Sequence, residues 1–179
     1  MKMKRKMRII AVVSFIFCIF VCCASHASED SLPKTGDIAL LVEGPEEHVP
    51  RVETNIINII RARGFRVVDE AKMKKIRLAA ARALADKYIL YGEKSKVLKI
   101  NATYNVAATI IATITPEEAR ENRIKLFTGT ASVSIVGVKN NGVKLGGQTS
   151  VSKQIGYTQA EALRKAVDEA VKNGMQQLF

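Results

Sequence analysis

Cysteine and histidine are scarce in this 179-residue chain. Its three cysteines, Cys18, Cys22 and Cys23, lie in or beside one apolar run near the start, and the one histidine beyond residue 27 is His48. The remainder therefore has no disulfide framework and no thiol chemistry. One histidine beside two glutamates offers too few ligands for a metal site, and no serine is spaced to form a catalytic triad with it.

Phosphate-binding loops and stacking aromatics are also missing. No G-x-G-x-x-G or Walker-type sequence occurs, and the chain has no tryptophan. We therefore expect no cofactor and no nucleic-acid partner. Glu43 and Asp69 lie at the ends of predicted parallel strands, where α/β proteins often place active groups. Contact with solvent or capping of the next helix is the favoured explanation of both residues, so an enzyme acting on envelope polymers is the least supported function.

Residues 1–27 have the parts of a secretory signal peptide. Five basic residues precede an apolar run from Ile9 to Ala24, and small residues follow at Ser25 and Ala27. The run is shorter than the about 20 residues that cross a bilayer. We expect cleavage after Ala27, export to the periplasm and a flexible lead over residues 28–36. An uncleaved N-terminal anchor and lipidation at Cys22 or Cys23 are the alternatives.

The signal segment also accounts for much of the positive charge. The whole chain has a net charge of +11, but five of its 28 basic residues and none of its 17 acidic residues lie in residues 1–27. The remaining residues, 23 basic and 17 acidic, have a net charge of +6. This excess favours acidic partners or anionic headgroups, or it is an ordinary solvated surface.

Residues 37–101 predict a strand, a helix, a strand and then two helices. Short apolar runs at 37–43 and 65–69 flank a segment that opens with Pro50 and closes with Gly64, both typical of helix ends. Short joints of this kind favour a right-handed crossover between parallel strands. From Glu70 to about Asn101 proline is absent and apolar residues recur at helical spacing, with a joint expected near Tyr91-Gly92.

The last third of the chain, Val106–Leu178, gives the clearest pattern. Val106–Thr115 is uncharged and β-branched, which is typical of a strand buried on both faces. Ile124–Lys139 alternates apolar with hydroxyl residues, so one side should be buried and the other wet. Asn141-Gly142 predicts a tight turn into a return strand over Val143–Ile155.

A capping box and an apolar stripe follow the predicted hairpin. Thr158 and Glu161 have the spacing with which a helix start satisfies its own backbone donors, and the stripe continues to Leu178. We therefore predict one α+β domain over residues 37–179. Its order is strand-helix-strand-helices-strand-strand-strand-helix, in a mixed sheet of about five strands with helices packed on one face.

Four segments carry a resemblance to known proteins: Tyr104–Ala112, Gly129–Val136, the Asn141-Gly142 turn and the helix Ala160–Leu178. Together they resemble the small α/β domain of bacterial envelope accessory proteins, namely flagellar assembly protein T, the curli secretion lipoprotein, penicillin-binding-protein activator lipoproteins and the N-terminal domain of TolB. The resemblance implies a non-enzymatic part in assembling or regulating an envelope structure, with no catalytic residues. The sequence lacks the clear lipidation signal of the lipoprotein members.

The leading hypothesis is a periplasmic or envelope-associated assembly factor that binds another envelope protein or forms a homo-oligomer. Its contact surface would be the hydroxyl face of the hairpin or the hairpin edge, unless that edge is simply solvated. The alternative is peripheral binding to anionic lipid or lipopolysaccharide through the basic helix Lys72–Arg82. The candidate partner-binding residues are Thr128, Thr130, Ser132, Ser134, Val143 and Lys144, and the candidate anion-binding residues are Lys72, Lys74, Lys75 and Arg82.

Overall fold

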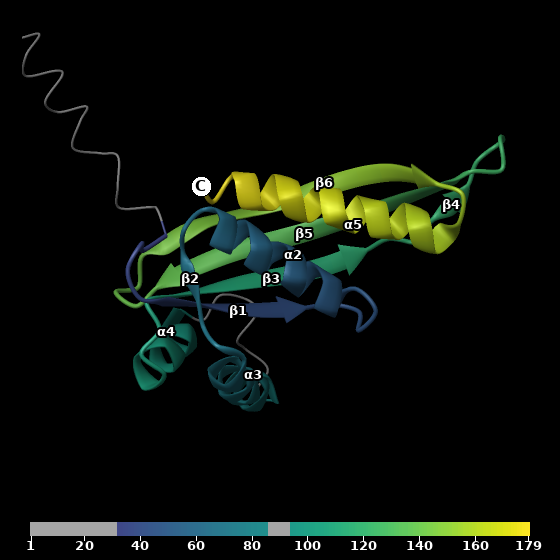
Figure 1. Ribbon diagram of the computed structural model, residues 1–179. Coiled ribbons are helices and arrows are strands. Elements are labelled where there is room, and N and C mark those ends of the chain that lie inside the picture. Colours follow the sequence, from purple (N-terminus) through teal and green to yellow (C-terminus); the bar gives the residue numbers. More distant parts are fainter. Residues whose placement is uncertain (1–31, 86–93) are drawn as a thin grey trace, which may run out of the picture. The chain divides into compact units, whose positions relative to one another are not determined.

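A computed structural model describes residues 32–85 and 94–179 (Figure 1). The expected signal peptide and the joint near Tyr91-Gly92 lie outside these residues. The two helices predicted on either side of that joint are present. In chain order the elements are β1 (Asp37–Glu43), α2 (Val49–Ala62), β2 (Arg66–Val67), α3 (Glu70–Ala85), α4 (Lys94–Thr103), β3 (Ala108–Pro116), β4 (Arg120–Glu121), β5 (Phe127–Lys139), β6 (Lys144–Gly156) and α5 (Gln159–Gln176).

The strands form one mixed, six-stranded sheet, which confirms the predicted α+β class. β1 runs parallel to β2 and to β3, whereas β5 runs antiparallel to β3 and to β6. The short β4 was not predicted, and it pairs with the start of β5. Since β3 and β4 both pair with β5, and β6 takes the other side of β5, β6 forms one edge of the sheet.

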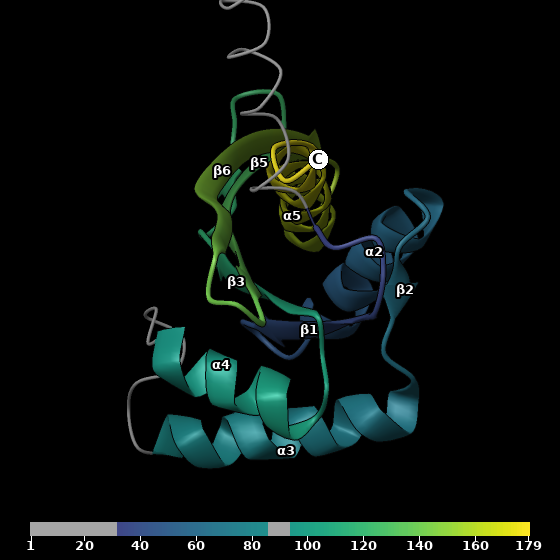
Figure 2. The same ribbon diagram turned by 90° about the vertical axis from the view of Figure 1, so that its left-hand side faces the viewer.

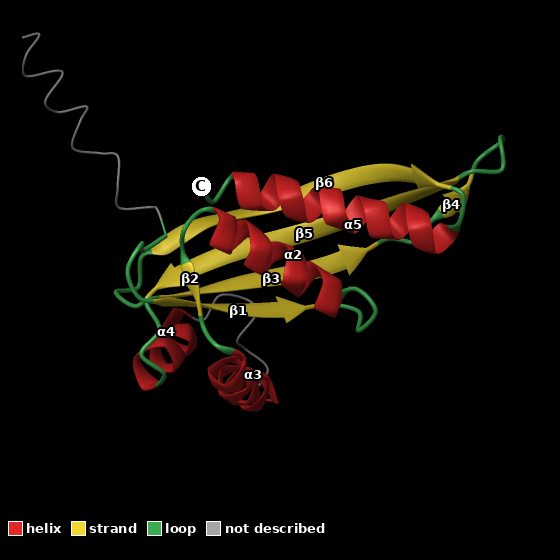
Figure 3. Cartoon of the chain, in the orientation of Figure 1, coloured by secondary structure: helices red, strands yellow, loops and turns green. Residues whose placement is uncertain are grey.

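The helices lie on both faces of the sheet, whereas the sequence analysis placed them on one. Figures 2 and 3 show α5 and α2 on one face, with β5 and β6 curling around α5. The pair α3 and α4 lies against the opposite face, next to β1. The difference has a local cause: β1 and β3 are apolar on both sides and require a cover on each. The buried runs Ile38–Leu41 and Ala108–Ala112 lie between these two layers.

α5 approaches the hairpin so closely that its first turns leave no room for a side chain on the strands. A Cβ atom built on Gly129 would lie 2.6 Å from the backbone of Ala162 and Leu163, and one built on Gly156 would lie 2.6 Å from the Ala162 nitrogen. Glycine is therefore required at both strand positions. Farther along α5 the glycine is on the helix: a Cβ atom built on Gly174 would lie 2.9 Å from the Ile135 side chain.

The predicted capping box is present at the start of α5. The Thr158 hydroxyl accepts a hydrogen bond of 3.1 Å from the Glu161 N–H, and the Glu161 carboxylate accepts one of 2.8 Å from the Tyr157 N–H. The Lys165 ammonium and that Tyr157 N–H lower the pKa of Glu161. A lowered pKa means that this contribution to stability is present at neutral pH and is lost as pH falls below the ordinary range of a glutamate.

One buried polar network ties α4 to the sheet. Asn101, only 1% exposed, donates from Nδ2 to the Val138 carbonyl at 3.1 Å and accepts from the Thr109 hydroxyl at 2.5 Å. All three groups are thereby satisfied away from water. On the other face, Arg51 of α2 holds Asp168 of α5 in a two-pronged ion pair.

The close approach of α5 predicts a sharp difference between two glycines of the same hairpin. Gly129→Ala should lower the free energy of unfolding by about 2–4 kcal/mol, because neither backbone can move away cheaply. Gly147→Ala is the matched control, since its new methyl group would be tight only against the flexible end of Lys144 and would meet Val136 at an ordinary 3.7 Å. It should change stability by less than about 1 kcal/mol. Urea unfolding of both variants measures this difference, and equal effects would contradict the packing described.

The buried network gives a second prediction. Asn101→Ala should lower the free energy of unfolding by about 2–3 kcal/mol, because it removes two buried hydrogen bonds and leaves the Thr109 hydroxyl without its acceptor. Asn58→Ala, an exposed position in the middle of α2, is the control and should change stability by less than about 0.5 kcal/mol. Urea unfolding again provides the measurement, and a neutral Asn101→Ala would show that α4 is held by other contacts.

Candidate functional site

The four predicted hydroxyl residues of β5 form a row on one face of the sheet. Register pairs all four with residues of β6 on one side, and pairs Ser132 and Ser134 with Thr115 and Thr113 of β3 on the other. None of these side chains is buried. Elsewhere on this face α3 packs against β1, and α4 packs against β3 and the Val138 end of β5. We call this surface the open face; it consists of Thr113, Thr115, Thr128, Thr130, Ser132, Ser134, Thr149, Val151, Lys153 and Ile155.

The other two predicted contact residues lie at the opposite end of the hairpin. Val143 belongs to the turn, where its N–H donates to the Asn141 side chain at 3.1 Å and its carbonyl accepts from Lys139 N–H at 2.9 Å. Lys144 begins β6 opposite Val138, four residues beyond Ser134 along β5. The structure therefore brings the four hydroxyl residues together and separates Val143 and Lys144 from them.

A shallow depression of about 530 Å³ lies at the far end of the open face. Thr128, Thr130 and Lys153 line it together with charged residues of the β3–β5 connection. Sequence patterns gave no signal for this convergence, because the connection contains the unpredicted β4. The connection contributes Glu117, Glu118 and Arg120.

The basic helix does not present its cations as one group. The Lys72 ammonium is half-buried, 3.3 Å from the Asp37 carboxylate and 3.4 Å from the Asn105 carbonyl, so it ties α3 to the sheet. Lys74 and Lys75 are exposed to solvent. Arg82 lies farther along α3, beside α4. The four residues predicted as an anion site are thus divided among three settings.

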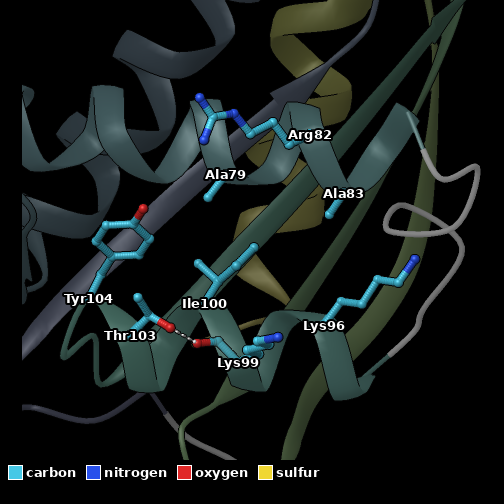
Figure 4. A pocket seen from close by; sticks show the side chains of 8 residues that line it. All are labelled: Ala79, Arg82, Ala83, Lys96, Lys99, Ile100, Thr103 and Tyr104. Atoms are coloured by element: carbon cyan, nitrogen blue, oxygen red, sulfur yellow. Dashed lines mark hydrogen bonds between the residues drawn. The ribbon is translucent and has the colours of Figure 1, made fainter.

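Arg82 instead shares a groove with two lysines that were not among the predicted anion-binding residues. Lys96 and Lys99 of α4 join it around a groove of about 550 Å³ between α3 and α4 (Figure 4). Ala79, Ala83 and Ile100 line the groove with apolar surface, and Tyr104 closes one end. An anionic group with an apolar portion matches such a lining, because cations and hydrocarbon lie side by side.

The carboxylates considered for catalysis do not meet. Asp69 accepts from the Lys72 N–H at 2.7 Å and so caps α3, while Glu43 lies at the far end of β1, where burial raises its pKa. His48 is buried, with Nε2 3.4 Å from the Glu47 carboxylate. In residues 32–85 and 94–179 no three metal-binding side chains converge. No helix in this part of the chain has the length and apolar character that crossing a membrane requires.

Comparison with known proteins identifies the fold. No protein-family model matches the sequence, and a search of curated proteins finds no significant match. Among solved structures, lipoprotein GNA1162 from Neisseria meningitidis is 15% identical with a TM-score of 0.53, covering 79% of this chain and 99% of its own. The PelC dodecamer from Paraburkholderia phytofirmans is 14% identical with a TM-score of 0.47, covering 83% and 92%. At these identities the likeness establishes the fold, which is one found in a bacterial lipoprotein.

Proposed function

We propose that this protein is an exported, non-enzymatic accessory or assembly factor of the bacterial envelope that acts by binding another protein. Support for the envelope comes from the signal-peptide pattern of residues 1–27 and from the fold shared with the Neisseria lipoprotein. Support for binding rather than catalysis comes from Glu43 and Asp69, which lie apart, with Asp69 capping α3.

The observation that carries the proposal is the open face itself. Three adjacent strands present hydroxyl groups and a few apolar side chains there, with no helix over them in the described part of the chain. Hydroxyl groups both donate and accept, so they can satisfy a partner's backbone or side chains without burying a charge. A flat surface of this kind suits a protein partner better than a small molecule.

A lysine in the middle of the open face should abolish the contact. Ser132→Lys would place a long charged side chain between β3 and β6 and should reduce partner cross-links in formaldehyde-treated cells by about tenfold or more. Thr35→Lys makes a matched change at an exposed position before β1 and should leave the cross-links unchanged. Equal cross-linking by both variants would contradict a role for the open face.

The groove between α3 and α4 favours a second function, peripheral binding to anionic lipid or lipopolysaccharide. Two cations, Arg82 of α3 and Lys99 of α4, line the same groove. A phosphate headgroup would be attracted to both, and the apolar lining of the groove would meet the adjoining hydrocarbon.

Vesicle binding tests this second function. The double variant Arg82→Gln, Lys99→Gln should bind vesicles of phosphatidylglycerol and phosphatidylcholine about 30-fold more weakly, at roughly 1 kcal/mol per charge. Arg164→Gln, Lys172→Gln removes two exposed cations from α5 and serves as the charge-matched control. Binding by the unmodified protein should also weaken between about 0.05 and 0.5 M salt. Indifference to salt, or equal loss in both variants, would eliminate the groove as a lipid site.

A further inference from the structure

The two edges of the sheet differ in how far other elements cover them. At the β1 edge, β2 pairs with the first residues of β1, and the Arg77–Glu53 ion pair joins α3 to α2 around the same side of the sheet. β6, by contrast, pairs only with β5 among the described strands, over Lys144–Gly156. Proteins usually cover or charge a long edge, because an uncovered one pairs readily with another strand.

The backbone directions along β6 follow from one hydrogen bond on its neighbour. The Thr130 carbonyl accepts from Glu117 N–H at 2.7 Å, so Thr130 turns its polar groups away from β6. In an antiparallel pair, two opposed residues point their backbone polar groups either both toward or both away from each other. Because Thr130 points its groups away from β6, its register partner Lys153 points its own N–H and carbonyl outward, away from β5. The outward-facing residues are Gly147, Thr149, Val151, Lys153 and Ile155.

Within residues 32–85 and 94–179, one of these outward groups contacts a side chain of another element. The Lys165 ammonium of α5 lies 3.4 Å from the Ile155 carbonyl, a long contact that leaves a lone pair available. The side chains at the same positions are on the open face, and two of them are large and apolar: Val151 is 65% exposed and Ile155 is 53% exposed. This edge therefore combines unpaired backbone groups with exposed apolar surface.

We propose that β6 pairs with β6 of a second copy of this chain, antiparallel and centred on Val151. This inference rests on the proposed function, because the edge residues Thr149 to Ile155 also belong to the open face. With Val151 on the two-fold axis, Lys153 of each copy lies opposite Thr149 of the other, and Ile155 lies over Gly147, which has no side chain to obstruct it. On the face toward α5, Ser150 meets Ser152, and Gln148 meets Gln154.

Charge restricts the register of this self-pairing. The segment 127–156 contains three lysines and no acidic residue, so pairing must keep the lysines apart. Centring on Lys153 would oppose two ammonium groups directly, which is destabilising. Centring on Thr149 would run the pairing into the bulge at Gly146, where the outward pattern ends. Centring on Val151 avoids both faults and pairs residues 147–155 of each copy.

Sedimentation velocity on the protein purified as cells produce it, from about 5 to 200 µM, tests the pairing. Val151→Pro removes an N–H that faces the edge, so the β5–β6 ladder stays intact while both central intermolecular bonds are lost. The dimer dissociation constant should rise on the order of 10- to 100-fold. Val151→Thr keeps the N–H and a β-branched side chain, and it should change the constant by less than about threefold.

A second variant keeps the self-pairing testable if the Val151→Pro protein fails to fold. Val151→Lys would set two ammonium groups across the axis, so dimerisation should be lost at low salt and partly recovered at about 0.5 M salt. An unmodified protein that is monomeric throughout, or one whose dimer resists both variants, overturns the self-pairing. If Ser132→Lys still abolishes cross-links in cells, the proposed function survives that result. Cross-links unaffected by Ser132→Lys overturn the proposed function and leave the self-pairing standing.

Discussion

The contact on which this fold depends is the one between α5 and the hairpin, where helix backbone rests directly on strand backbone at Gly129 and Gly156. Such an approach fixes the helix in position along the ribbon, because any displacement would either open a void or force a clash. The buried side of β5, which includes Ala131, Val133 and Ile135, packs beneath α5 as a result. The opposite side of β5 is left to the hydroxyl residues.

Much of this architecture was predictable because its signals are local. Asn141-Gly142, the alternation along β5 and the Thr158–Glu161 box each lie within one element, and all three produced the structure they indicated. β4 escaped prediction because two residues carry no periodicity. The division of the helices between two faces depends on the doubly apolar β1 and β3, and which helix covers which side of a sheet is a property of packing rather than of any one segment.

The candidate sites show the same limit more strongly. The hydroxyl row could be predicted because alternation along one strand places Thr128 to Ser134 on one side. The cationic groove could not, because Arg82 and Lys99 are brought together by two helices whose relative placement depends on the buried Asn101 network. Conversely, the sequence predicted Lys72 as an anion-binding residue, but in the folded chain its ammonium group pairs with the Asp37 carboxylate.

One feature of α5 has a mechanical consequence. Its first turns are seated on Gly129 and Gly156 at one end of the ribbon, while Phe179, just beyond its last turn, stacks on Phe65 with ring centroids 5.4 Å apart and lies under the Arg63 guanidinium. The helix is therefore a rigid strut anchored at both ends. A load applied to the tip of the ribbon would be carried along this strut to the loop between α2 and β2, which contacts its other end.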